Sequence, residues 1–174
     1  SVTGAPEILD GRVKTLHPRI HGGLLGKRGN PEHVSEMKEH GIEGIDLVVN
    51  NLYPFQQTVA NPDTTLDDAL ENIDIGGPAM TRAAAKNFQD VVVIVDPSDY
   101  EEIGNMLVSD GVSLECRRRL AAKAFQHIAV YDTVISAYLR DDDMSSDDKS
   151  SFFPEELTFG WNRVAIPRYG ENPH

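Results

Sequence analysis

The sequence contains a single cysteine, Cys116, so no disulfide can form within the chain. A lone cysteine is typical of a reducing compartment, and it excludes a zinc site built from several thiolates. No run of about 18 apolar residues could form a membrane-spanning helix. No basic segment followed by an apolar stretch resembles a signal peptide. We therefore expect a cytoplasmic protein with no membrane partner.

Positive charge is also scarce. The 174 residues include 16 Lys and Arg against 28 Asp and Glu, which gives a formal net charge of −12. A chain this acidic has no broad field for nucleic acid, so we expect no nucleic-acid partner. Even the three arginines at 117–119 would spread over different faces of a helix. An anionic substrate would be repelled except where cations lie close together, so the positions of the few Lys and Arg residues indicate where such a substrate could bind.

Short apolar runs alternate with helical patterns along the chain. The runs 45–49 and 91–95 are continuous and rich in β-branched residues, which is typical of buried strands in a parallel sheet. Helices are predicted at 31–40, 66–73, 78–87, 98–111 and 114–139. This alternation predicts an α/β layer fold. Two strands are few for such a sheet, so we expect that an N-terminal portion is missing.

Capping signals support several of these helices. Asn30 precedes a proline at the first helical position, and Pro78 is expected to open the Ala-rich helix. Ser98 and Glu101 have the spacing of a capping box. Residues 1–29 show no clear periodicity and are expected to be loop with at most a short strand.

Both ends of the sequence look cut, because it begins at Ser1 without Met and ends at His174 without a polar tail. We therefore expect it to be a piece of a larger protein. The acidic, Ser-rich run 140–151 is typical of a linker. No helix or strand pattern is visible in 152–174.

The first candidate site lies in residues 10–18 (DGRVKTLHP). If Arg12-Val13-Lys14 is extended, the alternation of side chains directs both cations to the same side. A guanidinium, an ammonium and the Thr15 hydroxyl together could hold a phosphate or a carboxylate. A solvated basic turn is the alternative.

Two further candidate sites lie where a predicted helix begins and where a predicted strand ends. The segment 74–78 (DIGGP) places Gly76 and Gly77 before a helix, whose first N–H groups favour an anion. The alternative is an ordinary turn capped by Asp74. The segment 50–54 (NNLYP) offers two amides and a phenol to a planar ligand. Its alternative is a turn with a half-buried tyrosine.

Lys86 is expected at the end of the Ala-rich helix, where a cation is stabilised by the helix dipole without any further role. His17 and His21 have the spacing of a helical metal pair. Pro18 lies between them and argues against a continuous helix, and no further ligand completes the set. We therefore expect no metal site.

Five segments taken together are far more specific than any one of them. They are 10–18 (DGRVKTLHP), 51–55 (NLYPF), 71–78 (ENIDIGGP), 83–87 (AAAKN) and 123–127 (KAFQH). The set closely resembles the inosine monophosphate (IMP) cyclohydrolase domain of the bifunctional purine biosynthesis proteins. That resemblance implies a parallel-sheet three-layer fold of the methylglyoxal-synthase-like type.

The resemblance also implies a division of the chain. Residues 1–139 would be a partial cyclohydrolase domain, 140–163 a linker, and 164–174 the start of the family's transformylase domain, because 168–174 (RYGENPH) resembles its opening. Family members normally begin with a further stretch that supplies a strand and part of the phosphate site. We therefore expect this fragment alone to be inactive.

The implied reaction closes formamidoimidazole carboxamide ribonucleotide to IMP with loss of water. It requires no metal or redox cofactor, whereas the transformylase would use formyl-tetrahydrofolate as co-substrate. By resemblance Lys86 is the acid/base residue, and a nearby Lys14 would help to tune it. Further catalytic positions are Tyr53 and Asp74. The implied substrate-binding positions are Arg12, Val13, Thr15, Asn50, Asn51, Ile75, Gly76 and Gly77.

A purine ribonucleotide ligand and a homodimer are also implied. Two alternative functions stay open. One is elimination of phosphate from a triose phosphate, as in methylglyoxal synthase. The other is a non-catalytic nucleotide-sensing module of the same fold.

Overall fold

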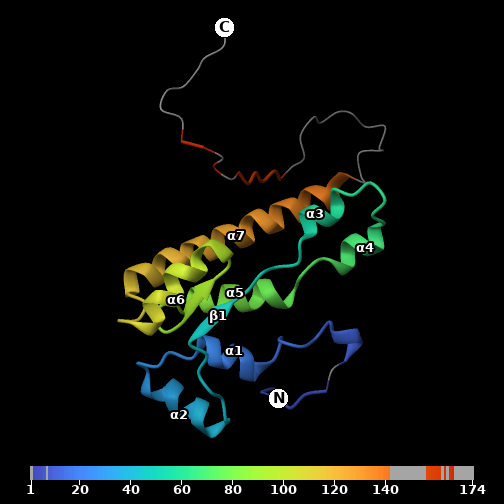
Figure 1. Cartoon of the computed structure of the whole chain (residues 1–174). Coiled ribbons are helices and arrows are strands. Elements are labelled where there is room, and N and C mark those ends of the chain that lie inside the picture. The colour runs from blue at the N-terminus through green and yellow to red at the C-terminus, as the bar shows by residue number, and fades with distance from the viewer. Residues whose placement is uncertain (1, 7, 142–155, 162, 164, 167–174) are drawn as a thin grey trace.

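The computed structural model describes residues 2–6, 8–141, 156–161, 163 and 165–166. Its elements are η1 (Leu9–Gly11), α1 (Pro18–Leu25), α2 (Pro31–Glu39), β1 (Leu47–Val49), α3 (Phe55–Val59), α4 (Leu66–Glu71), α5 (Gly76–Lys86), β2 (Val92–Ile94), η2 (Pro97–Asp99), α6 (Tyr100–Val108) and α7 (Leu114–Asp141). Figure 1 shows α7 as a long rod along one side of the molecule, with α1 and α2 on the side away from it.

The two strands run parallel, as predicted. Leu47 pairs with Val92, and Val49 pairs with Ile94. Each strand is shorter than the apolar run that predicts it. The expected burial is found for β2 but is wrong for β1, where Leu47 is 37% and Val49 50% exposed, because within the described residues Val48 is the β1 side chain that packs against the core. Within the described residues the sheet consists of these two strands.

Helices cover both faces of β2, because its side chains alternate between two clusters. Val91, Val93 and Val95 pack with the α5 alanines 83–85 and with residues of α7. Val92 and Ile94 pack with Ile103 of α6 and with the start of α7. The predicted α/β layer fold is confirmed.

Two helices begin with side-chain caps, of which the one at Asn30 was predicted. The Asn30 side chain accepts a hydrogen bond from the Glu32 N–H at the start of α2. Thr65 and Asp68 form a reciprocal capping box at the start of α4. These side chains satisfy first-turn N–H groups that have no partner within the helix.

Residues 1–29 are not simply loop, and that prediction was wrong. Pro18 occupies the first turn of α1, where its missing N–H costs nothing, and His17 caps the helix by accepting from the Arg19 N–H at 3.1 Å. Pro18 therefore starts a helix instead of preventing one. The expected short strand is an isolated bridge between Ile8 and Val13.

Two other helix starts differ from their predictions. α5 begins at Gly76, ahead of Pro78. The predicted capping box of Ser98 with Glu101 is wrong, because the Asp96 side chain accepts from the Ser98 N–H at 2.9 Å and caps η2. Ser98 lies inside η2, two residues after the N-cap, so its side chain is not at the start of the helix.

α7 extends to Asp141, two residues past its predicted end and into the predicted linker 140–163. Residues 142–155 of that linker, and most of the predicted second-domain start at 164–174, lie outside the described residues. Among the described helices, none is both long and apolar enough to cross a membrane.

Candidate active site

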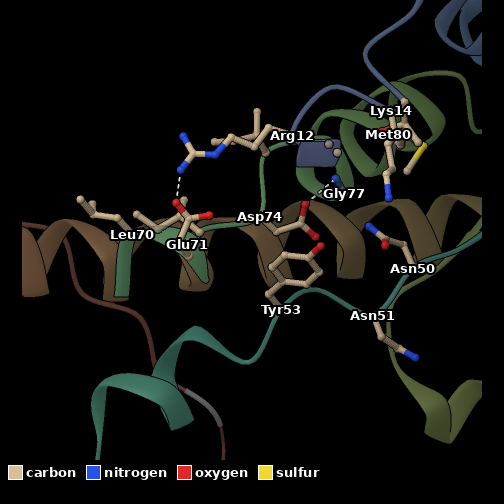
Figure 2. Close-up of a pocket in the computed structure, with 15 residues that line it drawn as sticks. Arg12, Lys14, Asn50, Asn51, Tyr53, Leu70, Glu71, Asp74, Gly77 and Met80 are labelled. Atoms are coloured by element: carbon tan, nitrogen blue, oxygen red, sulfur yellow. Dashed lines mark hydrogen bonds and ion pairs between the residues drawn. The ribbon is translucent and has the colours of Figure 1, made fainter. Parts of the chain in front are cut away.

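A cavity of about 580 Å³ opens beside the carboxyl end of β1. It is lined by Gly11, Arg12, Lys14, Thr15, Asn50, Asn51, Tyr53, Leu70, Glu71, Ile73, Asp74, Ile75, Gly76, Gly77 and Met80. Segments before α1, after β1 and between α4 and α5 therefore meet there (Figure 2). The carboxyl edge of parallel strands is the usual ligand position in α/β folds.

The cavity collects three of the four predicted catalytic residues. They are Lys14, Tyr53 and Asp74. It also collects every predicted substrate-binding residue except Val13, whose backbone bridges to Ile8. The chemical roles of these residues stay predictions.

The N-terminus of α5 forms one wall, and its glycines allow other chain segments to come close. The Gly77 N–H donates to Asp74 Oδ1 at 2.8 Å, which fixes one carboxylate oxygen (Figure 2). A Cβ on Gly77 would lie 2.9 Å from Asn50 Nδ2, and one on Gly76 would lie 2.6 Å from Thr15 Oγ1. Both distances are too short for a real Cβ contact, so a side chain at either position would force Thr15, Asn50 or Asp74 to move.

The end of β1 is tied to α5 and α6 through its two asparagines. The Asn50 N–H continues the strand ladder by donating to the Ile94 carbonyl, and Asn50 Nδ2 donates to Thr81 Oγ1 at 2.8 Å. Asn51 Nδ2 donates to the Tyr100 hydroxyl at 3.0 Å. The amides thus reach the cavity wall with defined orientations.

Cations and carboxylates alternate around the opening. Arg12 donates to Glu71 and forms an ion pair with it. Arg12 has φ −64° and ψ −19°, so the extended backbone predicted for it is wrong. Arg12 and Lys14 nevertheless both line the cavity, and Figure 2 shows the Lys14 ammonium directed toward Asn50. The lining therefore brings Arg12 and Lys14 together in an acidic chain, beside the carboxylates of Glu71 and Asp74.

Sequence reasoning missed two residues at this site. Glu71 enters the sequence analysis only as part of the segment 71–78, and its pairing with Arg12, 59 residues away, cannot be seen in the sequence. Tyr131 lies in the predicted helix 114–139, and no local signal indicates that it contacts this site. Its hydroxyl accepts from the Asp74 N–H at 2.9 Å and donates to the Asn72 carbonyl at 3.3 Å. Burial raises the pKa of Tyr131.

Lys86 does not join the cluster. Gly76 and Lys86 are the first and last residues of the 11-residue α5, which separates them by about 15 Å along the helix axis. Lys86 is exposed and is not among the residues that line the cavity. The expected proximity of Lys14 and Lys86 is therefore not found within this chain.

The histidine pair is accounted for by helix capping. His17 Nδ1 accepts from the Arg19 N–H, and His21 lies within α1. Among the described residues, no group of three or more His, Cys, Asp and Glu side chains is arranged to hold a metal ion.

A second cavity, of about 460 Å³, lies between α3, the end of β2 and α7. Lys123 Nζ contacts Asp96 at 2.6 Å and Asp99 at 2.7 Å on its wall. The hydrogen bond from Lys123 lowers the pKa of Asp96 to about 2. Burial lowers the pKa of the neighbouring His127. Lys123 is thus already neutralised by two carboxylates.

Comparison with known proteins gives two family matches and several close relatives. The AICARFT/IMPCHase bienzyme model matches residues 84–174, and the MGS-like domain model matches residues 1–79. The chain is 58% identical to the bifunctional purine biosynthesis protein PurH of Halalkalibacterium halodurans and 55% identical to that of Bacillus subtilis, over 99% of this chain and 33% of each relative. It therefore spans about a third of the length of the curated relatives it matches.

The crystal structure of ForH superposes on this fold with a TM-score of 0.66 and 40% sequence identity. The match covers 78% of this chain and 70% of that one. The chain therefore belongs to the AICARFT/IMPCHase bienzyme family, and its α/β fold is of the MGS-like type.

Proposed function

We propose that this chain is part of a bifunctional enzyme of purine biosynthesis, and that its main cavity closes formamidoimidazole carboxamide ribonucleotide to IMP. The relatives named as bifunctional purine biosynthesis proteins support the pathway. The single observation that carries the cyclohydrolase activity is the meeting of Lys14, Tyr53 and Asp74 in one cavity.

The reaction needs orientation and proton transfer only. The carboxamide nitrogen forms a bond to the formyl carbon, and the formyl oxygen leaves as water with one proton from each of the two nitrogens. No oxidation state changes, so no redox cofactor is needed. We also propose that no metal takes part, because the charged and phenolic side chains of the cavity can carry out the proton transfers. Holding the two arms of one substrate together supplies much of the rate enhancement, and positioned acids and bases supply the rest.

The cavity residues divide into proton donors and a proton acceptor. The Lys14 ammonium and the Tyr53 phenol are donors suited to the formyl oxygen as it gains negative charge. The Asp74 carboxylate is suited to accept from the carboxamide nitrogen. Its Oδ1 is already held by the Gly77 N–H, which fixes its direction before substrate arrives.

The substrate phosphate is assigned to Arg12, Thr15 and the Gly76 N–H at the start of α5, because the Gly77 N–H already donates to Asp74 and Pro78 has no N–H. A backbone N–H at a helix start favours an anion, and a guanidinium pairs well with phosphate oxygens. In the structure Arg12 is ion-paired with Glu71, and the substrate phosphate would displace the Glu71 carboxylate from Arg12.

Lys86 is the acid/base residue that the family resemblance implies, but its position at the far end of α5 does not support contact with a substrate in this cavity. We therefore propose that Lys14, and not Lys86, is the lysine at the reacting atoms. A homodimer also stays part of the proposal, and sedimentation of the complete protein would test it.

The complete protein that contains this chain should convert the formamido nucleotide to IMP, which is followed by its ultraviolet absorbance. Triose phosphate, assayed in parallel, distinguishes a phosphate lyase, and tight IMP binding without turnover distinguishes a sensing module. Absence of IMP formation would reject the proposal.

The proposed phosphate site can be tested separately from the cyclisation. Arg12→Ala should weaken IMP binding by about tenfold or more in calorimetry, because a charge-assisted hydrogen bond is lost. Arg19→Ala is the matched control, since Arg19 lies outside the cavity lining. If Arg12→Ala and the wild-type protein bind IMP with equal affinity, Arg12 is not part of the phosphate site.

A further inference from the structure

Tyr131 joins the long helix α7 to the turn that carries Asp74. Its hydroxyl accepts from the Asp74 N–H at 2.9 Å and donates to the Asn72 carbonyl oxygen at 3.3 Å. One hydroxyl thus holds both ends of the short turn 72–74, across a separation of 57 residues between Tyr131 and Asp74.

This turn depends on that contact because it lies between two helices. α4 ends at Glu71 and α5 begins at Gly76, so Asp74 belongs to neither. The structure gives the Asp74 N–H no other acceptor among the described residues. The direction of the Asp74 carboxylate is therefore set by two hydrogen bonds, one that the Asp74 N–H donates to the Tyr131 hydroxyl and one that Asp74 Oδ1 accepts from the Gly77 N–H.

Tyr131 is itself held in place. Its ring packs edge-on against Phe55 at 6.4 Å between centroids, and Phe55 is 1% exposed. The same Phe55 ring packs edge-on against Tyr138 at 5.6 Å. Its phenol is neutral near pH 7 and can donate to Asn72, and burial raises the pKa of Tyr131 further.

We propose that Tyr131 is a positioning residue, which holds the turn 72–74 so that the Asp74 carboxylate points into the cavity. The inference rests on the proposed function, in which Asp74 meets the substrate. Tyr131 does not touch the substrate, since it is not among the residues that line the main cavity. Its loss should therefore affect turnover and leave phosphate binding by Arg12 and Thr15 nearly unchanged.

Two variants of the complete protein test this placement without an activity assay. Tyr131→Phe removes the hydroxyl and keeps the ring. Tyr138→Phe is the matched control, because its ring packs on the same Phe55 and its hydroxyl has no hydrogen bond within the described part of the chain. Hydrogen exchange at the Asp74 amide should quicken by about two- to tenfold in Tyr131→Phe only. An unchanged rate would overturn the inference.

Kinetics then separate positioning from general stability. In Tyr131→Phe, kcat should fall by about tenfold, while KM changes by less than about twofold. Adding Tyr131→Phe to Asp74→Asn should cause no further loss, because both act on one carboxylate. Multiplicative losses would overturn the positioning role. A wild-type protein without cyclisation would reject the proposed function, while the exchange rates would still decide whether Tyr131 holds the turn.

Discussion

Asn50 at the end of β1 donates through its side-chain amide to the hydroxyl of Thr81 in α5, at 2.8 Å. Thr81 is fully buried. This bond fixes the strand end against the helix one turn beyond Gly77, and so sets one corner of the cavity.

Replacing Thr81 by valine keeps the shape and removes the acceptor. We expect the free energy of unfolding to fall by about 1–3 kcal/mol, because the Asn50 amide loses its partner. Urea unfolding measures this. Thr133→Val is the control, since Thr133 bonds only to the Ala129 carbonyl of its own helix, and it should stay within about 0.5 kcal/mol of wild type. Equal stability of the two variants would contradict the role of this bond.

Replacing Lys14 should lower the rate of cyclisation far more than replacing Lys86. Lys14→Ala should lower kcat by about a hundredfold or more, as expected on loss of a proton donor at the reacting atoms. Lys86→Ala should change kcat by less than about tenfold, because Lys86 lies at the opposite end of α5 from the cavity. Turnover by the two purified full-length variants measures the difference. A hundredfold loss in folded Lys86→Ala would return Lys86 to the chemistry.

Gly77 and Gly104 both lie in helices, but replacement by alanine should be harmful at Gly77 and favourable at Gly104. A Cβ on Gly77 would meet the Asn50 amide at 2.9 Å, whereas one on Gly104 would meet nothing within 4 Å. Gly77→Ala should weaken IMP binding by about tenfold, since Asn50 and Asp74 must shift. Gly104→Ala should raise the free energy of unfolding by about 0.5–1 kcal/mol. Unaltered IMP affinity in Gly77→Ala would show that the wall tolerates a Cβ.

The Asp96 carboxylate should stabilise the fold in a defined pH range. Its hydrogen bond from Lys123 lowers its pKa from 3.8 to about 2. A lowered folded-state pKa gives stability that is fully present above about pH 4 and is lost as pH falls toward about 2. The difference in urea midpoint between wild type and Asp96→Asn should therefore shrink over this range. Asp110→Asn, at a residue with no ion pair in the described structure, should show no such convergence.

The sequence was sufficient for the sheet and for most of the cavity because both depend on local patterns. Continuous β-branched runs predict parallel strands, and glycines before a helix predict close approach. α1 was missed because Pro18 was interpreted as a helix breaker, although proline is favoured in the first helical turn. The proline that marks the start of this helix was taken as evidence against a helix.

Two residues depend on packing between distant parts of the chain. The resemblance groups Lys86 with Lys14, whereas the structure places Lys86 at the opposite end of α5 from the cavity, and its chemical role stays a prediction. Tyr131 was not predicted as part of the site, because nothing near it in sequence shows that its hydroxyl reaches a turn 57 residues away. Contacts of this range follow from packing, which single-sequence periodicity does not encode.

The alanines at 83–85 have a consequence for ligand size. They belong to the core cluster that also holds the valines at 91, 93 and 95 and residues of α7, and all three are below 8% exposed. Small side chains let α5 pack close to these neighbours, and the same helix begins with the two glycines that line the cavity. A bulkier side chain here would push α5 away from the core and shift its first residues, which lie about two turns away. The width of the opening therefore depends on core residues that do not line it.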